Sequence, residues 1–204
     1  MNLLSSKLAL IPSEVSFSEV MKALANYFKL KQERKKKKKE FSYHQKIAEL
    51  HAQKSYRPVQ VFILYNNNRQ FLVVQSPQEQ HSWGFPQGGI LHTENLAENL
   101  IRELQEELGI SHSELQHLTY NFYEGKVDFE PARRGERGFS AGKYYFFTVG
   151  KYERIGKITA NPKEIAQLRW LTLSQVLKLF ASIRAEKKII LTEALQRAVV
   201  LVHE

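Results

Sequence analysis

One stretch of the chain, Trp83 to Ile110, joins a glycine-rich loop to an amphipathic helix and constrains both the fold and the chemistry. It reads WGFPQGGILHTENLAENLIRELQEELGI. Glu103, Glu106 and Glu107 recur at i, i+3 and i+4, which places three carboxylates on one helix face. Such neighbours repel one another and destabilise a helix unless a cation compensates them. The spacing therefore predicts either a site for a hard divalent cation such as Mg²⁺ or a solvated acidic face.

The same stretch resembles the motif of the Nudix family, G-x5-E-x7-R-E-U-x-E-E-x-G-U, in which U is aliphatic. Every fixed position of the motif is filled: Gly88, Glu94, Arg102, Glu103, Leu104, Glu106, Glu107, Gly109 and Ile110. A match of this length at fixed spacing is far more specific than a lone glycine motif. The resemblance implies an enzyme that hydrolyses nucleoside diphosphates linked to another moiety, with Mg²⁺ or Mn²⁺ as the cofactor.

The resemblance also implies roles for single residues. Three carboxylates and one backbone carbonyl would be metal ligands: Glu103, Glu106, Glu107 and Gly88. Arg102 would orient the glutamates rather than bind the substrate. The general base would be one of these glutamates or an acidic residue from elsewhere in the fold. Glu164 is the candidate from elsewhere, and the alternative for Glu164 is an ordinary surface glutamate.

The flanking segments are similar to the group of RNA pyrophosphohydrolases and dinucleoside polyphosphate hydrolases. SYRPVQVFIL precedes WGFPQGGI, and KYYFF and EIAQLRWLTLSQV follow it, so the similarity covers roughly residues 56 to 200. In that group the residues matching Arg57, Gln87 and Lys143 lie near the phosphates, where cations are favourable because the substrate is a polyanion. Arg57 could instead be a surface arginine, and Gln87 could be an amide that stabilises the loop.

Three functions follow, in order of preference. The first is hydrolysis of RNA 5′-triphosphate ends or dinucleoside polyphosphates. The second is a pyrophosphatase of ADP-ribose, nucleotide sugars or nucleoside triphosphates. The third is a catalytically silent module that binds nucleotides or RNA, which the intact Glu103, Glu106 and Glu107 disfavour.

The positive charge of the chain is concentrated near its N-terminus. Of a formal net charge of +9 over 204 residues, +7 falls within residues 1 to 56, which contain 12 Lys or Arg and 5 Asp or Glu. We therefore expect a basic, mostly helical extension over residues 1–55 and the Nudix domain over residues 56–204. The run Lys35–Lys39 predicts one of three roles: a solvated helix surface or linker, contact with the phosphate backbone of RNA or with another anion, or a localisation signal.

The composition narrows the cellular setting. No run approaches 18 uncharged apolar residues, so no transmembrane helix or membrane partner is expected. The N-terminus has no secretory-signal pattern, and the chain contains no cysteine. We expect a cytoplasmic enzyme whose partner is a nucleotide or an RNA 5′ end. The sequence leaves its oligomeric state open.

Hydrophobic periodicity predicts the fold class. Strands are expected at residues 59–65, 70–75, 118–123, 143–149 and 165–171, with the first two joined by a turn at residues 66–69. Helices are expected at residues 17–32, around Ile47 and Leu50, after Thr172 or Ser174, and at residues 188–202. The sum is an α/β fold, and the resemblance implies the α/β/α sandwich of the Nudix family with a mixed sheet.

Two further segments bear on the site. Asn95 and Glu98 form a capping box for the catalytic helix, Gly109 suits its C-cap, and Glu98 is spaced to pair with Arg102. The apolar stripe of that helix is predicted to be Ala97, Ile101, Leu104 and Leu108. The loop over residues 125–142 contains Arg133, Arg134 and Arg137, and it predicts either contact with a nucleotide or plain disorder.

Overall fold

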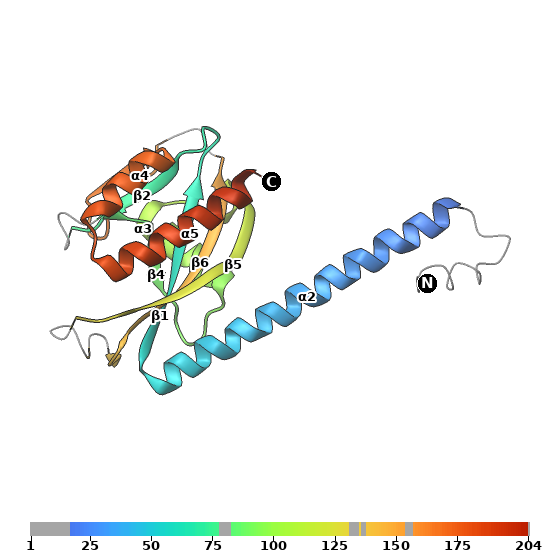
Figure 1. Cartoon of the computed structure of the whole chain (residues 1–204), viewed down its shortest axis with the longest axis horizontal. Helices are drawn as coiled ribbons and strands as arrows, with labels where there is room; N and C mark the ends of the chain where they lie inside the picture. The colour runs from blue at the N-terminus through green and yellow to red at the C-terminus, as the bar shows by residue number, and fades with distance from the viewer. Residues whose placement is uncertain (1–16, 78–82, 131–134, 136–137, 154–156, 204) are drawn as a thin grey trace. The chain divides into compact units, whose positions relative to one another are not determined.

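A computed structural model describes residues 17–77, 83–130, 135, 138–153 and 157–203 of the chain. The chain divides into two units, Met1–Lys46 and Ile47–Glu204. The described part of the first unit belongs to a single helix, whereas the second unit contains the sheet and the helices that follow it in the chain (Figure 1). Every candidate catalytic residue lies in the second unit.

Helix α2, Phe17–Gln53, runs through the Lys35–Lys39 segment without a break. The prediction of one helix over residues 17–32 and a separate short helix around Ile47 is therefore wrong. No glycine or proline occurs between residues 13 and 57, and the charged residues in between have high helix propensity. Lys54, with φ of 49°, follows the end of the helix. The capping box predicted at Ser16 lies outside the described residues.

The last turns of α2 belong to the second unit. Ile47 and Leu50 are buried there, with exposed fractions of 2% and 4%. One turn on, the His51 ring nitrogen Nε2 bonds to the carbonyl oxygen of Ile90 at 2.9 Å. These contacts fix the C-terminal end of the helix against the loop that follows the glycine-rich segment.

A seven-stranded mixed sheet forms the centre of the second unit. Its strands are β1 (Tyr56–Tyr65), β2 (Phe71–Gln75), β3 (Trp83–Gly84), β4 (Gln87–Gly89), β5 (Leu115–Asp128), β6 (Gly142–Tyr152) and β7 (Gln167–Leu171). The main path runs β3-β2-β1-β6-β5, with β4 on β1 and β7 on β2. Among the strand pairs of the described residues, only β1–β6 is parallel. The sheet is therefore mixed, as predicted.

Strand β1 changes its partner along its length. Near its C-terminal end Tyr65 pairs with Phe71 of β2, through the predicted turn at residues 66–69. Nearer its start, Val59, Gln60 and Val61 pair with β4. Because β2 and β4 occupy the same side of β1 in succession, the sheet splits between them, and this split positions the site.

Helices cover both faces of the sheet (Figure 1). Helix α3, Leu96–Leu108, packs on one face through a cluster that includes Phe62, Leu64 and Leu104. Helices α4 (Leu173–Leu179) and α5 (Ala185–His203) pack on the other face, in a cluster that includes Val61 and Leu195. Short 3₁₀ turns also occur at His112–Glu114 and Phe180–Ser182. The predicted α/β/α sandwich is confirmed.

Several predicted boundaries differ from the structure. Strand β5 is about twice as long as predicted, because its pairing with β6 continues to Asp128, where a loop was expected. Strand β7 begins at Gln167 rather than at Ile165, since the Ile165 N–H is bonded to the carbonyl of Asn161. Helix α5 begins three residues earlier than predicted. The cap of α4 at Thr172 is confirmed.

Candidate active site

Helix α3 is terminated at both ends as predicted. The Asn95 side chain accepts hydrogen bonds from the backbone N–H groups of Ala97 and Glu98, and the Glu98 carboxylate accepts from the Asn95 N–H. Gly109 closes the C-terminus in the left-handed conformation, with φ of 64°. These local contacts fix where the helix begins, and hence which of its positions face the sheet.

The predicted apolar stripe of α3 is only partly right. Leu104 and Leu108 are fully buried, but Ile101 is 42% exposed. Leu96, Asn99 and Leu100 are buried instead. The helix is rotated so that the polar Asn99 enters the interior, where its Nδ2 donates to the Gly89 carbonyl at 2.9 Å. This contact ties the helix to strand β4.

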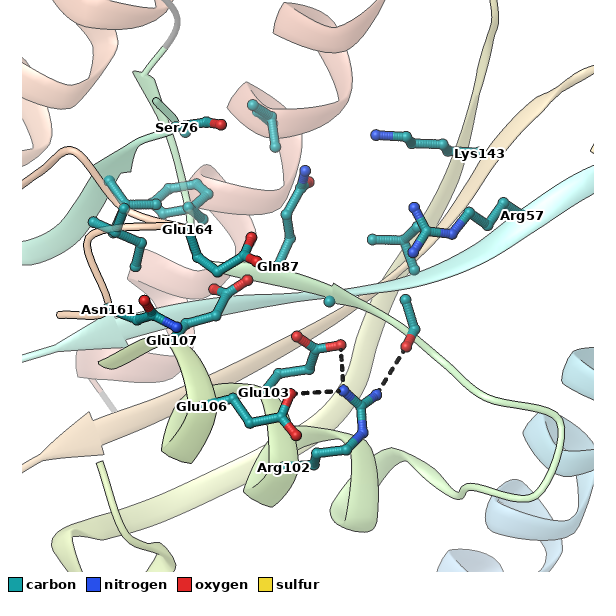
Figure 2. Close-up of a pocket in the computed structure, with 18 of the residues that line it drawn as sticks. Arg57, Ser76, Gln87, Arg102, Glu103, Glu106, Glu107, Lys143, Asn161 and Glu164 are labelled. Atoms are coloured by element: carbon teal, nitrogen blue, oxygen red, sulfur yellow. Dashed lines mark hydrogen bonds and ion pairs between the residues drawn. The ribbon is translucent and has the colours of Figure 1, made fainter. Parts of the chain in front are cut away.

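A cavity of about 650 Å³ lies beside the split in the sheet. All nine predicted site residues line it: Arg57, Gln87, Gly88, Arg102, Glu103, Glu106, Glu107, Lys143 and Glu164. They come from β1, β4, α3, β6 and the segment before β7. The structure thus brings together residues that lie more than 100 positions apart in the sequence (Figure 2).

Four carboxylates form the acidic wall of the cavity: Glu103, Glu106, Glu107 and Glu164. Burial and the neighbouring carboxylates, chiefly Glu103 and Glu164, raise the pKa of Glu107 to about 8. Burial also raises the pKa of Glu103, although the Arg102 guanidinium opposes this effect. Negative charge is therefore crowded on this wall more closely than the described side chains neutralise it.

Arg102 bonds to several of the glutamates near the cavity. Its Nε donates to Glu94 Oε1 at 2.5 Å, and its Nη1 donates to Glu103 Oε1 at 2.8 Å and to Glu106 Oε2 at 3.4 Å. Its Nη2 donates to the Gly89 carbonyl at 3.0 Å. The hydrogen bonds that Glu94 accepts from Arg102, and then those from the Leu91 N–H and the Asn99 side chain, lower the pKa of Glu94 to about 2. The pairing of Arg102 with Glu98 that the spacing predicted is replaced by this arrangement, because the Glu98 carboxylate accepts a hydrogen bond from the backbone N–H of the cap residue Asn95.

Two adjacent glycines let charged side chains lie directly against strand β4. A Cβ atom built on Gly88 would fall 1.9 Å from the Glu103 carboxyl carbon. A Cβ atom built on Gly89 would fall 2.1 Å from Arg57 Nη2. Successive residues of a strand face opposite sides of the sheet. The carboxylate and the guanidinium therefore approach the same short strand from its two faces.

The opposite wall of the cavity is basic. Arg57 on β1 and Lys143 on β6 are direct neighbours in the parallel pair, so their side chains leave the sheet on the same face. Gln87 lies between these cations and the glutamates (Figure 2). Lys187, in the first turn of α5, also lines the cavity and was missed from the sequence. The sequence offered one indication of Lys187: it lies four residues, about one helical turn, before Leu191, which the structure shows to be buried.

The segment before β7 places Glu164 beside α3. The Asn161 N–H donates to the Glu107 carbonyl at 2.8 Å, and the Asn161 carbonyl accepts from the Glu164 N–H at 3.0 Å. The Asn161 side chain accepts from the Lys163 N–H at 3.1 Å. Asn161 lines the cavity and was also missed. The dipeptide Asn161-Pro162 is a turn signal that could have indicated it.

The donor atoms of the acidic wall fit a hard divalent cation. All of them are carboxylate oxygens, the ligand type that Mg²⁺ and Mn²⁺ prefer, and Gly88 leaves room for the Glu103 carboxylate against the strand. With Glu103 and Glu106 held by Arg102, no three acidic, histidine or cysteine side chains among the described residues converge closely enough to hold a metal as they stand.

Two other sequence expectations bear on this region. Arg133, Arg134 and Arg137, predicted either to contact a nucleotide or to be disordered, lie outside the described residues. Across the part of the chain that the structure describes, no helix has the length and apolar character needed to cross a bilayer.

Comparison with known proteins identifies the family. The family model described as the NUDIX domain matches residues 55–192. The chain therefore belongs to the Nudix family, and the predicted class of enzyme, a Nudix pyrophosphohydrolase, is confirmed. A curated RNA pyrophosphohydrolase from Teredinibacter turnerae is 26% identical over 136 residues, which cover 64% of this chain and 80% of the relative.

Two solved structures share the fold. The E. coli dihydroneopterin triphosphate pyrophosphohydrolase superposes with a TM-score of 0.58 at 16% identity, covering 72% of this chain and 98% of its own. A C. elegans Ap4A hydrolase binary complex superposes with a TM-score of 0.52 at 18% identity, covering 71% and 98%. At these identities the likeness concerns the fold alone.

Proposed function

We propose that this Nudix hydrolase cleaves a pyrophosphate bond in RNA 5′-triphosphate ends or in dinucleoside polyphosphates, with Mg²⁺ or Mn²⁺ as its cofactor. The observation that carries the proposal is the cavity with an acidic wall on one side of β4 and a basic wall on the other. A substrate with three or more phosphates requires both walls. Basic side chains bind its negative charge, and carboxylates hold the metal ion at the phosphate that reacts.

The names of two of the three relatives support this choice of substrate, whereas the E. coli structure is that of a dihydroneopterin triphosphate pyrophosphohydrolase. The Teredinibacter protein is named as an RNA pyrophosphohydrolase, and the C. elegans structure is that of an Ap4A hydrolase. ADP-ribose, nucleotide sugars and nucleoside triphosphates are the alternative substrates, and a silent binding module is the alternative to an enzyme. The cytoplasmic location expected from the sequence remains part of the proposal.

Each residue of the site has a proposed role. Three carboxylates and one backbone carbonyl hold the cation: Glu103, Glu106, Glu107 and Gly88. When bound, the cation would neutralise phosphate charge and acidify a water molecule. Arg102 orients Glu103 and Glu106 through the hydrogen bonds described above. Glu164, exposed at the edge of the acidic wall, is the proposed general base.

The basic wall is proposed to bind the phosphate chain. Arg57 and Lys143 would contact the phosphates that remain on the product, and the Gln87 amide, between the two walls, would donate to a bridging or terminal oxygen. Outside the cavity, the Lys35–Lys39 run is proposed to contact the phosphate backbone of RNA, with a solvated helix surface as its alternative.

A screen that separates and identifies the reaction products by chromatography tests the substrate. Purified chain is compared on triphosphorylated RNA, capped RNA, diadenosine tetraphosphate, ADP-ribose and nucleoside triphosphates, with Mg²⁺, with Mn²⁺ and with EDTA. We expect the highest kcat/KM on triphosphorylated RNA or diadenosine tetraphosphate. A higher value on ADP-ribose or on single nucleotides would reject this substrate class, and turnover of nothing would favour the binding module.

The variant Glu106→Gln tests the metal assignment. The Glu106 side chain is 60% exposed, so we expect the variant to fold normally. Loss of one oxygen ligand should lower kcat by about 100-fold or more. Glu49→Gln, an exposed glutamate on another helix, is the matched control and should keep wild-type activity. Near-wild-type turnover by Glu106→Gln would refute the assignment.

A further inference from the structure

The first unit exposes an unusual set of apolar side chains for a single helix. Five of them occur within ten residues and are between 44% and 57% exposed: Met21, Leu24, Tyr27, Phe28 and Leu30. The described part of this unit is one helix, so it has no core of its own in which to bury them. Clustered apolar surface of this kind marks an interaction site more often than scattered single residues do.

Helical spacing gathers most of this set on one side of α2. Met21, Leu24, Phe28, Lys31 and Lys35 recur at i, i+3, i+7, i+10 and i+14, which is one face of a helix. Tyr27 borders this face, and its ring lies 5.8 Å from that of Phe28 in an edge-to-face arrangement. We refer to these six residues as the 21–35 face.

The 21–35 face changes character along its length. Its first two turns carry apolar and aromatic side chains, and its next two carry exposed lysines at the same helical positions. Glu33 falls on the opposite side of the helix. The surrounding segment, residues 17–46, contains 10 Lys or Arg against 3 Glu. The face therefore combines flat apolar rings with positive charge in one line.

A second copy of the chain does not suit this face. A coiled coil requires apolar residues at the a and d positions over at least three or four heptads. Here the apolar seam ends at Phe28, and Lys31 and Lys35 occupy the following seam positions. Two such helices would place lysines against lysines in a parallel pair and lysines against apolar side chains in an antiparallel pair. A membrane surface is also a poor match, because an interfacial helix has its lysines on the side opposite its apolar face, whereas Lys31 and Lys35 here lie on the same side as Leu24 and Phe28.

Single-stranded nucleic acid matches both halves of the face. Aromatic rings stack on unpaired bases, and lysines contact the phosphates of the same strand. We infer that the 21–35 face of α2 binds single-stranded RNA, with bases on Tyr27 and Phe28 and phosphates on Lys31 and Lys35. The inference rests on the proposed function only for the choice of RNA as the polyanion.

The test compares two pairs of variants in the full chain. Lys31→Gln/Lys35→Gln removes two charges from the 21–35 face, and Lys22→Gln/Lys29→Gln removes two charges from the other side of the same helix. Binding of a fluorescent 20-nucleotide single-stranded RNA is measured by anisotropy between 50 and 200 mM salt. We expect Lys31→Gln/Lys35→Gln to lose about tenfold in RNA affinity. The slope of log affinity against log salt concentration should become shallower by about 1.4, or about 0.7 for each charge removed. The second pair should lose less than threefold, and equal losses would overturn the inference.

The aromatic half is tested by Tyr27→Ala/Phe28→Ala, with Leu30→Ala as the control for an exposed apolar side chain elsewhere on the helix. Alanine favours helix, so circular dichroism should show the helix intact. We expect the double variant to lose about tenfold in affinity for single-stranded RNA and little for duplex RNA, since paired bases cannot stack on it. An unchanged affinity for single strands would overturn the inference.

Two further measurements distinguish other partners and the proposed function. Preferential binding to vesicles of phosphatidylglycerol, or a dimer that the aromatic substitutions dissociate, would replace RNA as the occupant. Turnover of diadenosine tetraphosphate should be unchanged in Tyr27→Ala/Phe28→Ala, in Leu30→Ala and in Lys22→Gln/Lys29→Gln. RNA binding should persist in Glu106→Gln, so failure of the catalytic proposal and failure of this inference give different results.

Discussion

Arg102 determines the arrangement of charge at the active site. One guanidinium bonds to Glu94, Glu103, Glu106 and the Gly89 carbonyl, so it links the loop, the strand and the helix. The sequence motif predicted a residue that orients the glutamates. It could not show that the motif glutamate Glu94 is a partner of Arg102, because the two lie eight positions apart and meet only when the loop folds back.

The Glu94–Arg102 pair predicts an acid-dependent loss of stability. Because Arg102 lowers the pKa of Glu94 to about 2, the pair stabilises the folded state above pH 4.5 and loses this contribution as the pH falls towards 2. Glu94→Gln should lower the free energy of unfolding at pH 7 by about 1–2 kcal/mol. It should also flatten the acid limb of stability against pH, as urea unfolding between pH 2.5 and 7 would measure. An acid limb identical to wild type would contradict the assignment.

The position of Lys187 in the cavity lining predicts that the enzyme distinguishes substrates by the number of their phosphates. Lys187 adds a further cation, from another element, to the lining that contains Arg57 and Lys143, so it should matter most for substrates with long phosphate chains. Lys187→Ala should raise KM for diadenosine tetraphosphate about tenfold while changing that for ADP-ribose less than threefold. Lys187→Arg should restore most of the loss. Lys188→Ala, an exposed neighbour with the same charge change, is the control and should behave as wild type.

At the scale of elements, local signals were more predictable than long-range ones. The caps of α3 and α4 lie within a few residues of the sequence they terminate, so Asn95, Gly109 and Thr172 were read correctly. The buried face of α3 was predicted only in part, because it depends on where the sheet lies relative to the helix. The full length of β5 was also missed, since only its pairing with β6 extends it to Asp128.

Substitution by alanine is predicted to have opposite outcomes at Gly88 on β4 and at Gly84 on β3. Gly88→Ala would place a methyl group against the flexible end of Glu103, so the fold should survive while the carboxylate is displaced. We expect kcat to fall by about 100-fold with a change in stability of less than about 1 kcal/mol. Gly84 also lines the cavity but has no atom within 4 Å of a built Cβ, so Gly84→Ala should retain activity. Equal activity of both variants would refute the steric account.

On the scale of the whole molecule, the sequence indicated a basic extension and a catalytic domain but left their boundary as a prediction. Composition located the charge, yet it could not show that α2 continues from one unit into the next. The buried positions of Ile47 and Leu50 follow from packing in the second unit. Lys187 and Asn161 were missed for a similar reason, since they reach the cavity only through the fold.

Two truncations test the boundary. A chain beginning at Ile47 should keep wild-type turnover of diadenosine tetraphosphate, because the catalytic unit is retained. A chain beginning at Ser55 also loses the burial of Ile47 and Leu50 and the bond from His51 to Ile90. Its free energy of unfolding, measured in urea, should be lower than that of the chain beginning at Ile47 by at least about 3 kcal/mol. Equal stability of the two truncations would place the boundary at residue 55.

The pair Gly88-Gly89 has a consequence for how the gene can vary. Every missense change of a glycine codon introduces a Cβ atom, because glycine alone lacks one. At codon 88 any such change meets Glu103, and at codon 89 any such change meets Arg57. A saturation library of these two codons should therefore yield two separate classes of defective allele, one impaired on the acidic side of the strand and the other on the basic side.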